Sequence, residues 1–273
     1  MNRIDATFDR LRSDHEMGLF PYLTAGFPTL DATERLALAA LDAGADGIEL
    51  GVPFSDPLAD GTTLQHASEV ALRNGASLSW TLELASRLRR ATEAPLVLMT
   101  YYNLVHHFGL QRFAREAVAA GIDGAIVPDL PSVESAPLLD AAKAAGLYLI
   151  QMVAPTTTDA HFAEVARTAQ GFVYCVSLLG TTGARATVSD RLPSFMTKVR
   201  GILRQPLQIG FGIARPEHIV GVRHYADAVV VGAAIADLLR MTPGESWVPT
   251  LSAYITDMKA ACKPAPAGTT VEA

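Results

Sequence analysis

The stretch "DATERLALAALDAGADGIELG", residues 31–51, contains a helix, a turn and a strand in succession. Leu and Ala recur at three- and four-residue spacings as far as Ala43, which is typical of a helix with one buried face. Gly44 then marks the end of the helix, because glycine readily adopts the left-handed conformation found there. The apolar run 47–51 predicts a strand covered on both faces, as in a parallel sheet. The stretch therefore predicts an α/β fold.

The same unit recurs along the chain. Two further helical patterns end in Ala-Gly, at Ala120-Gly121 and Ala145-Gly146. Nearly continuous apolar runs predict strands at 19–23, 47–51, 96–101, 124–128, 148–153, 172–177, 207–210 and 228–232. Helical patterns occupy 31–43, 110–120, 134–145, 160–169 and 216–225, with extra helices at 63–74 and 247–261. Eight βα units in about 250 residues predict a single (β/α)8 TIM barrel. A doubly wound open sheet is the alternative, because periodicity does not reveal closure.

Composition limits the class of protein. The chain has 273 residues, of which 49% are hydrophobic and 18% charged, and its formal charge is −6 with no large basic block. We therefore expect no nucleic-acid or membrane partner. The N-terminus lacks the apolar stretch of a signal peptide, and two cysteines form no disulfide framework, so we expect a cytoplasmic protein. The barrel domain is predicted over residues 1–262, followed by a disordered Pro- and Ala-rich tail, 263–273.

Polar groups follow the predicted strands where each strand ends, whereas the helix-to-strand joints are mostly Ala-Gly. In a barrel the C-terminal strand ends carry the active site. Glycine-bearing loops at 180–184, 210–213 and 232–234 would let backbone N–H groups approach an anion closely. Because loops after the seventh and eighth strands commonly bind phosphate in such barrels, the three loops together favour a phosphate site over simple turns.

The motif "ELGVPFSDPLADG", from Glu49 to Gly61, places three carboxylates and two prolines where a buried strand ends. With it occur "PYLTAG" from Pro21, "MTYYN" from Met99, "PDLP" from Pro128, "GTTGAR" from Gly180 and "GFGI" from Gly210. On these motifs the chain resembles the alpha subunit of tryptophan synthase, from residue 20 to about residue 258. That family cleaves indole-3-glycerol phosphate to indole and glyceraldehyde 3-phosphate, a lyase reaction of L-tryptophan biosynthesis.

The resemblance implies that Glu49 and Asp60 are the catalytic acids. Retro-aldol cleavage requires indole C3 to be protonated and the side-chain hydroxyl to lose its proton. Glu49, at an apolar strand end, is expected to be desolvated, which raises its pKa toward the working pH. Asp60 would accept the indole N–H and stabilise the positive charge on the ring. A buried acid paired with an arginine is the structural alternative for Glu49, but its loop contains no basic residue.

The resemblance also implies the rest of the site. Substrate-binding residues would be Phe20, Tyr101, Asp129, Ile150, Tyr174, Thr182 and Phe211. Phosphate would be bound by backbone N–H groups of Gly183, Gly212, Ile213, Gly232 and Ala233. A hydrogen bond between Thr182 and Asp129 would close the sixth loop over substrate and exclude water. Two departures weaken this picture: Ala233 replaces a serine of many relatives, and Leu178 leaves the sixth loop without the arginine that some relatives have.

Partners follow from the same resemblance. Asp56, between Pro53 and Pro57, would face the beta subunit in an αββα heterotetramer, so that Asp60 could respond allosterically to partner binding. Pyridoxal phosphate would belong to the beta subunit, and no cofactor is expected on this chain. Two alternatives stay open: a free-standing lyase that releases indole without a partner, and a non-catalytic barrel that activates the beta subunit.

Other chemistries find little support in the residues. The seven histidines show no metal-ligand spacing, so no metal site is expected. No Gly-x-Ser-x-Gly motif supports a serine nucleophile. A Schiff-base aldolase is disfavoured because the lysines fall in predicted helices or in the tail: Lys143, Lys198, Lys259 and Lys263.

Overall fold

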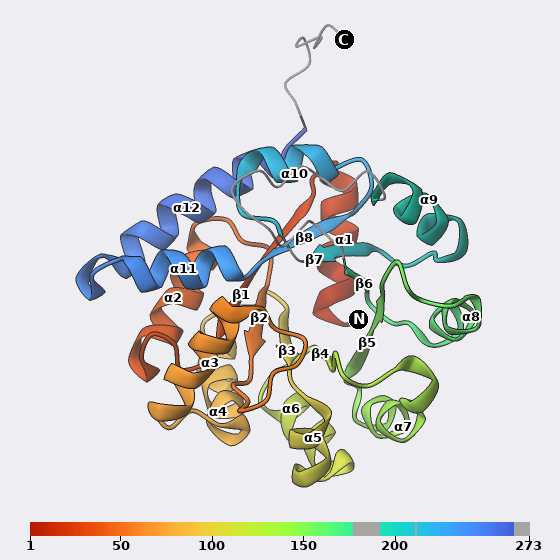
Figure 1. Ribbon diagram of the computed structural model, residues 1–273, viewed down its shortest axis with the longest axis horizontal. Helices are drawn as coiled ribbons and strands as arrows, with labels where there is room; N and C mark the ends of the chain where they lie inside the picture. The colour runs from red at the N-terminus through yellow and green to blue at the C-terminus, as the bar shows by residue number, and fades with distance from the viewer. Residues whose placement is uncertain (177–191, 211, 265–273) are drawn as a thin grey trace, which may run out of the picture.

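The structure, a computed structural model, describes residues 1–176, 192–210 and 212–264. Eight parallel strands follow one another around a closed barrel, in which β1 pairs with both β2 and β8 (Figure 1). This closure confirms the TIM barrel and rules out the open sheet. The strands are β1 Gly18–Thr24, β2 Ile48–Gly51, β3 Leu96–Met99, β4 Gly124–Ile126, β5 Tyr148–Val153, β6 Val173–Val176, β7 Leu207–Gly210 and β8 Ala228–Val231.

Helices surround the strands, and each helix predicted from the sequence is present. Side-chain oxygens cap several of them, for example Thr29 at α2 and Ser77 at α4. The helices are α1 Arg3–Asp14, α2 Leu30–Asp42, α3 Thr62–Arg73, α4 Leu78–Arg89, α5 Tyr102–Phe108, α6 Leu110–Ala119, α7 Ala136–Ala145, α8 Asp159–Thr168, α9 Leu192–Ile202, α10 Pro216–Val222, α11 Ala233–Met241 and α12 Trp247–Cys262, with 3-10 turns η1 Ser132–Glu134 and η2 Gly244–Ser246.

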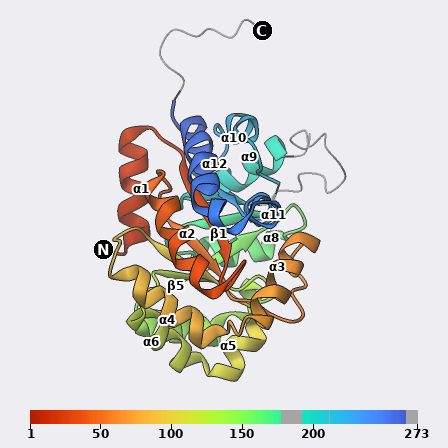
Figure 2. The ribbon, with the colours of Figure 1, turned by 90° about the vertical axis from the view of Figure 1, so that its left-hand side faces the viewer.

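Helix α1 was not predicted, and it closes one end of the barrel, on the left in Figure 2. Its buried side chains Ile4, Phe8 and Leu11 join the cluster that fills the barrel interior. The ring of Phe8 lies 6.0 Å from that of Phe20 on β1 and 5.7 Å from that of Phe172, measured between centroids. These aromatic rings form the lowest layer of the interior.

The layer above contains polar side chains. Tyr22 and Tyr174 point into the interior, and each ring occupies the space over a glycine of the adjacent strand. A Cβ atom at Gly51 would lie 1.9 Å from the Tyr22 hydroxyl, and one at Gly210 would lie 1.8 Å from the Tyr174 hydroxyl. Glycine is therefore required at both positions if the tyrosines are to keep these places.

Three aspartates share one structural role at the N-terminal ends of the strands. Each lies one or two residues before an even-numbered strand, and its carboxylate accepts a backbone N–H near the start of the preceding strand at 2.7–2.9 Å: Asp46 from Leu19, Asp123 from Leu96 and Asp227 from Leu207. Each also binds cations from the surrounding helices: Arg10 and Lys259 for Asp46, Arg3 and Arg89 for Asp123, Arg200 for Asp227. The aspartates thus tie neighbouring strands to the outer layer.

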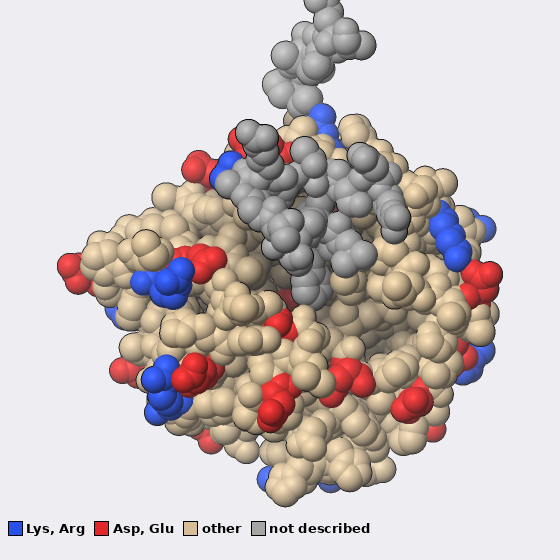
Figure 3. Space-filling view, in the orientation of Figure 1, with Lys and Arg blue, Asp and Glu red and all other residues tan. Residues whose placement is uncertain are grey.

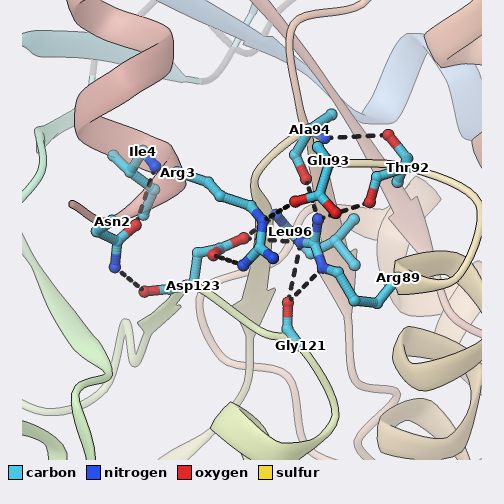
Figure 4. A network of polar contacts seen from close by, with 10 residues as sticks. All are labelled: Asn2, Arg3, Ile4, Arg89, Thr92, Glu93, Ala94, Leu96, Gly121 and Asp123. Carbon is cyan, nitrogen blue, oxygen red and sulfur yellow. Dashed lines mark hydrogen bonds and ion pairs between the residues drawn. The ribbon is translucent and has the colours of Figure 1, made fainter.

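The network around Asp123 involves α1 and the ends of two strands (Figure 4). Its carboxylate lies 2.8 Å from Arg89 and 3.2 Å from Arg3. The Arg89 side chain is 13% exposed and also donates to the carbonyl oxygens of Thr92, Ala94 and Gly121. Because Arg3 belongs to α1, this network fastens the end-closing helix to the barrel.

None of the helices in the described ranges has the length and apolar character needed to cross a membrane. Cys175 and Cys262 are free, buried thiols. They pack in the core as small apolar side chains do. Of the predicted tail, residues 265–273 lie outside the described residues.

Replacing Asp123 by Ala is expected to lower the free energy of unfolding by about 3 kcal/mol, because Arg89 would lose its buried partner. Urea denaturation would measure the loss. Glu93, the exposed partner of Arg3, provides the matched control. Glu93→Ala is expected to change stability much less, and equal losses in the two variants would contradict the role given to Asp123.

Candidate active site

Glu49 lies on β2 with its side chain inside the barrel and no exposed surface. Burial raises the pKa of Glu49 to about 8. The Gln208 side chain donates from Nε2 to Oε1 of Glu49 at 2.5 Å, which opposes this rise. Within the described ranges no cation forms an ion pair with Glu49, and its Oε2 atom is buried without a hydrogen-bond partner. The buried acid–arginine pair considered from the sequence is therefore not found among these residues.

Asp60 lies at the end of the loop that connects β2 to α3. The loop turns back at Pro57, whose carbonyl oxygen accepts the Asp60 N–H at 3.0 Å. Tyr101 holds the loop from below, since its hydroxyl accepts the Ala59 N–H at 3.2 Å and its ring stacks on Phe54. Burial raises the pKa of Asp60 to about 6, and a hydrogen bond with Tyr101 opposes the rise. Oδ1 of Asp60 is buried without a partner in the described part of the chain.

The two acids therefore differ in protonation near neutral pH. With a pKa of about 8, Glu49 retains its proton at pH 7, whereas Asp60, with a pKa of about 6, is mostly ionised. One group can then donate a proton while the other accepts a hydrogen bond or stabilises positive charge. Both have a buried oxygen that the described residues leave unpartnered, which a bound ligand could use.

The predicted pocket walls divide into two groups. Tyr174 and Ile150 lie in the interior, and Tyr101 lies beside Asp60. Phe20 lies apart from them, in the lowest layer against Phe8 and Phe172, fully buried. The residue of β1 that reaches the level of the acids is Tyr22, which pairs in register with Glu49.

The predicted phosphate site lies at the start of α11 and in the turn after β7. Helix α11 begins at Ala233, and its N-cap Gly232 supplies no side-chain hydrogen bond. The first backbone N–H groups of a helix lack intrahelical partners, so those of α11 can bind an anion. In the turn, Gly212 adopts a φ of +82° and Ile213 is buried.

This turn is braced from α10 and α12. The hydroxyl of Tyr254 donates to the Ala214 carbonyl oxygen at 2.9 Å. Nδ1 of His218 lies 3.0 Å from the Gly212 carbonyl oxygen and 3.2 Å from the Ala214 nitrogen. The turn is thus held in place by side chains that the sequence did not single out.

The remaining predicted residues lie on loops at the same end of the barrel. Asp129 is exposed, and its Oδ1 accepts the Tyr102 N–H at 2.8 Å, at the start of α5. Asp56 is exposed next to Leu58, whose surface is 90% accessible. Four further predicted positions lie outside the described residues: Leu178, Thr182, Gly183 and Phe211.

Sequence reasoning missed Tyr22 and Gln208. Tyr22 could have been predicted from the sequence. Side chains two positions apart in a strand share a face, so Tyr22 faces the interior as the predicted residue Phe20 does. Gln208 has a weaker signal, a lone polar residue inside an apolar run. Among the described residues no group of three His, Cys, Asp or Glu side chains is placed to bind a metal ion.

The face of the molecule seen in Figure 3 is hollowed near its centre. In this view several acidic side chains lie below the hollow, while the Lys and Arg side chains visible on this face lie toward its edge.

Known proteins resemble this chain in both sequence and architecture. A family model described as tryptophan synthase alpha chain matches residues 8–263. The tryptophan synthase alpha chain of Citrifermentans bemidjiense is 45% identical over 259 residues, which cover 95% of this chain and 97% of that protein. The Chloroflexus aggregans protein of the same name is 46% identical over 263 residues, covering 96% and 98%.

Solved structures agree with these relatives. Tryptophan synthase subunit alpha from Legionella pneumophila superposes with a TM-score of 0.86 at 33% identity, covering 96% of this chain and 98% of that one. A chain from the tryptophan synthase a2b2 complex of Pyrococcus furiosus gives a TM-score of 0.84 at 36% identity, covering 90% and 98%. The family model and the relatives both extend over nearly the whole chain, and this chain belongs to the tryptophan synthase alpha chain family.

Proposed function

We propose that the chain cleaves indole-3-glycerol phosphate to indole and D-glyceraldehyde 3-phosphate, as the alpha subunit of a tryptophan synthase. The observation that carries this proposal is the unlike pair of buried acids, Glu49 with its pKa near 8 and Asp60 with its pKa near 6. The family relationship supplies the reaction, and the two environments supply a reason for each acid.

Glu49 would use Oε2, which the described residues leave without a hydrogen-bond partner, for both proton transfers. It first protonates indole C3, which leaves a carboxylate. That carboxylate then takes the proton of the side-chain hydroxyl, and the oxygen forms a carbonyl as the carbon–carbon bond breaks. The electron pair of that bond returns to the indole ring, and Glu49 ends the cycle protonated as it began.

Asp60 would accept a hydrogen bond from the indole N–H. Protonation at C3 places positive charge on the ring, and an ionised carboxylate beside the ring nitrogen stabilises that charge. The ionised state of Asp60 at neutral pH suits this role. Its loop is held by Tyr101, so the carboxylate is placed before substrate arrives.

The rest of the site is proposed on the family resemblance and the geometry together. Tyr22, Tyr101, Ile150 and Tyr174 would surround the indole ring. Backbone N–H groups would bind the phosphate, at Gly212, Ile213, Gly232 and Ala233 and, outside the described residues, at Gly183. Ala233 offers no hydroxyl, so the phosphate would rely on the N–H groups of α11. Phe211 and a Thr182–Asp129 contact would complete the closed site.

The proposed partner is a beta subunit, in an αββα heterotetramer. The Pyrococcus furiosus relative comes from an a2b2 complex. Exposed Asp56 and Leu58 lie on the loop that also carries Asp60, so contact there would reach the catalytic acid directly. Pyridoxal phosphate would belong to the beta subunit, and this chain would act in the cytoplasm without a cofactor of its own.

The alternative function, a non-catalytic barrel that activates a beta subunit, does not explain why the interior contains the buried carboxyl group of Glu49. Burying an ionisable carboxyl group without a cation destabilises the fold unless the group stays protonated. An activating scaffold has no use for such a group, whereas a proton donor does. Glu49 therefore favours the catalytic role over the scaffold.

Replacing Glu49 by Gln is expected to lower indole release from indole-3-glycerol phosphate by at least about 100-fold, because the amide cannot transfer the proton. The assay would be run with the alpha chain alone and with a beta subunit added. Undiminished release would refute the catalytic assignment, while release without a partner at the full rate would favour a free-standing lyase.

The same variant is expected to be at least as stable as the wild type. The folded-state pKa of Glu49 lies above its ordinary value of 4.5, so the wild type loses stability as pH rises from about 4.5 to about 8. Glu49→Gln cannot ionise and avoids this loss. Thermal unfolding across that range would test it, and a stability difference that shrinks with rising pH would contradict the raised pKa.

The pH profile of kcat/KM is expected to be bell-shaped with its maximum near pH 7. Activity should fall below about pH 6 as Asp60 is protonated, and above about pH 8 as Glu49 loses its proton. Steady-state rates of indole release across that range would show both limbs. Asp60→Asn should lose the acidic limb and keep the basic limb; a profile unchanged in shape would argue against Asp60.

Asp56→Ala is expected to weaken binding of the beta subunit about tenfold at low salt and to reduce its stimulation of indole release, because an exposed interface charge is lost. Titration with a beta subunit would measure both effects. Asp140, exposed on α7, is the matched control. If Asp56→Ala behaves like Asp140→Ala, the loop does not carry the partner contact.

A further inference from the structure

Gln208 is a fully buried polar side chain inside the barrel. Its neighbours on β7, Leu207 and Ile209, pack into the outer cluster between strands and helices, which leaves Gln208 facing the interior. β7 and β2 are not adjacent in the barrel, because β8 and β1 lie between them. The bond from Gln208 Nε2 to Glu49 Oε1 therefore crosses the interior.

The bond distinguishes the two oxygens of the Glu49 carboxyl group. Oε1 accepts the amide N–H, so the proton of the neutral acid belongs on Oε2. Oε2 is buried and unpartnered among the described residues. After Oε2 has given up its proton, the carboxylate keeps the same bond at Oε1, and Oε2 stays open to receive the next proton. One fixed contact thus serves both protonation states.

We propose that Gln208 is a positioning residue for this reaction: by holding Oε1 of Glu49 it turns Oε2 toward the substrate for both proton transfers. The inference rests on the proposed function of Glu49. It goes further by assigning the proton exchange to one oxygen, and the orientation of that oxygen to a residue on the non-adjacent strand β7.

Gln208 shows little sign of a purely structural role. Its own Oε1 atom is buried without a partner in the described part of the chain. An unsatisfied buried acceptor destabilises the fold, and an apolar side chain of the same length would fill the space without that cost. What the amide contributes is therefore its N–H group, which contacts Glu49.

Among the described residues, the other groups that face Glu49 do not lower its pKa. The hydroxyls of Tyr22 and Tyr174 and the carboxylate of Asp60 are the nearby titratable groups, and each is neutral or anionic. Burial is the cause that raises the pKa of Glu49. The amide of Gln208 acts in the opposite direction and lowers the pKa of Glu49.

The test replaces Gln208 by Met, which keeps the length of the side chain and removes the donor. We expect kcat for indole release to fall about 10- to 100-fold, because Oε2 is no longer held in the productive orientation. KM should change by less than about twofold, since ground-state contacts remain. The basic limb of the pH profile should move to higher pH, because Glu49 loses a bond that favours its ionised form.

Gln151 provides a matched control. It is a buried glutamine on β5 whose side chain donates to the Leu149 carbonyl oxygen at 3.4 Å and does not contact Glu49. Gln151→Met should retain kcat and the basic limb. If Gln208→Met has the same kcat and the same limb as Gln151→Met, the inference is wrong.

Two further measurements distinguish the positioning role of Gln208 from the proposed catalytic role of Glu49. In a Glu49→Gln background, Gln208→Met should cause no additional loss of kcat. Full activity in Glu49→Gln alone refutes the proposed function, whereas an inactive Glu49→Gln with a fully active Gln208→Met refutes only the positioning role. Thermal unfolding would check that each variant is folded. Gln208→Asn, whose amide is one methylene too short to reach, should show the same split between kcat and KM if the Met variant does not fold.

Discussion

A carboxyl group in the apolar interior of a barrel, with an amide beside it in place of a cation, is the constraint on which the rest of the site depends. Burial keeps Glu49 protonated near neutral pH, and the bond from Gln208 determines which oxygen carries the proton. Asp60 has a less enclosed position on a loop and stays ionised under the same conditions. The fold thus gives two similar groups different protonation states near neutral pH, chiefly through differences in solvation.

Much of the fold could be predicted from the sequence, because the apolar runs and the Ala-Gly helix ends are local signals. The eight strands and the seven helices with predicted ranges begin and end within a few residues of those ranges, whereas α1, α4, α5, α9 and α11 had none. Helix α1 was missed because charged residues surround its few apolar positions, although Ile4, Phe8 and Leu11 have helical spacing. Its role depends on the open end of a barrel, which no local pattern describes.

The residues of the candidate site also divide into those with a local sequence signal and those that only the assembled barrel reveals. Glu49 and Asp60 lie in one short motif, so the sequence alone could propose them as catalytic acids. It also predicted that their environments would differ, and they do. Tyr22 required the direction of side chains along β1, and Phe20 was chosen instead. Gln208 could be recognised only after the barrel was closed, because its contact joins strands separated by 159 positions in sequence. Contacts across the interior are properties of the assembled barrel.

The three anchoring aspartates have a consequence for how such a chain can diverge. Asp46, Asp123 and Asp227 fasten the strands at their N-terminal ends, away from the proposed catalytic acids. Loops at the C-terminal ends of the strands can therefore lengthen, shorten or exchange residues without breaking the aspartate contacts that hold the strands together. Substitutions should be tolerated less at the N-terminal ends of the strands than in the loops at their C-terminal ends. New substrate preferences can then arise while the anchoring contacts stay the same.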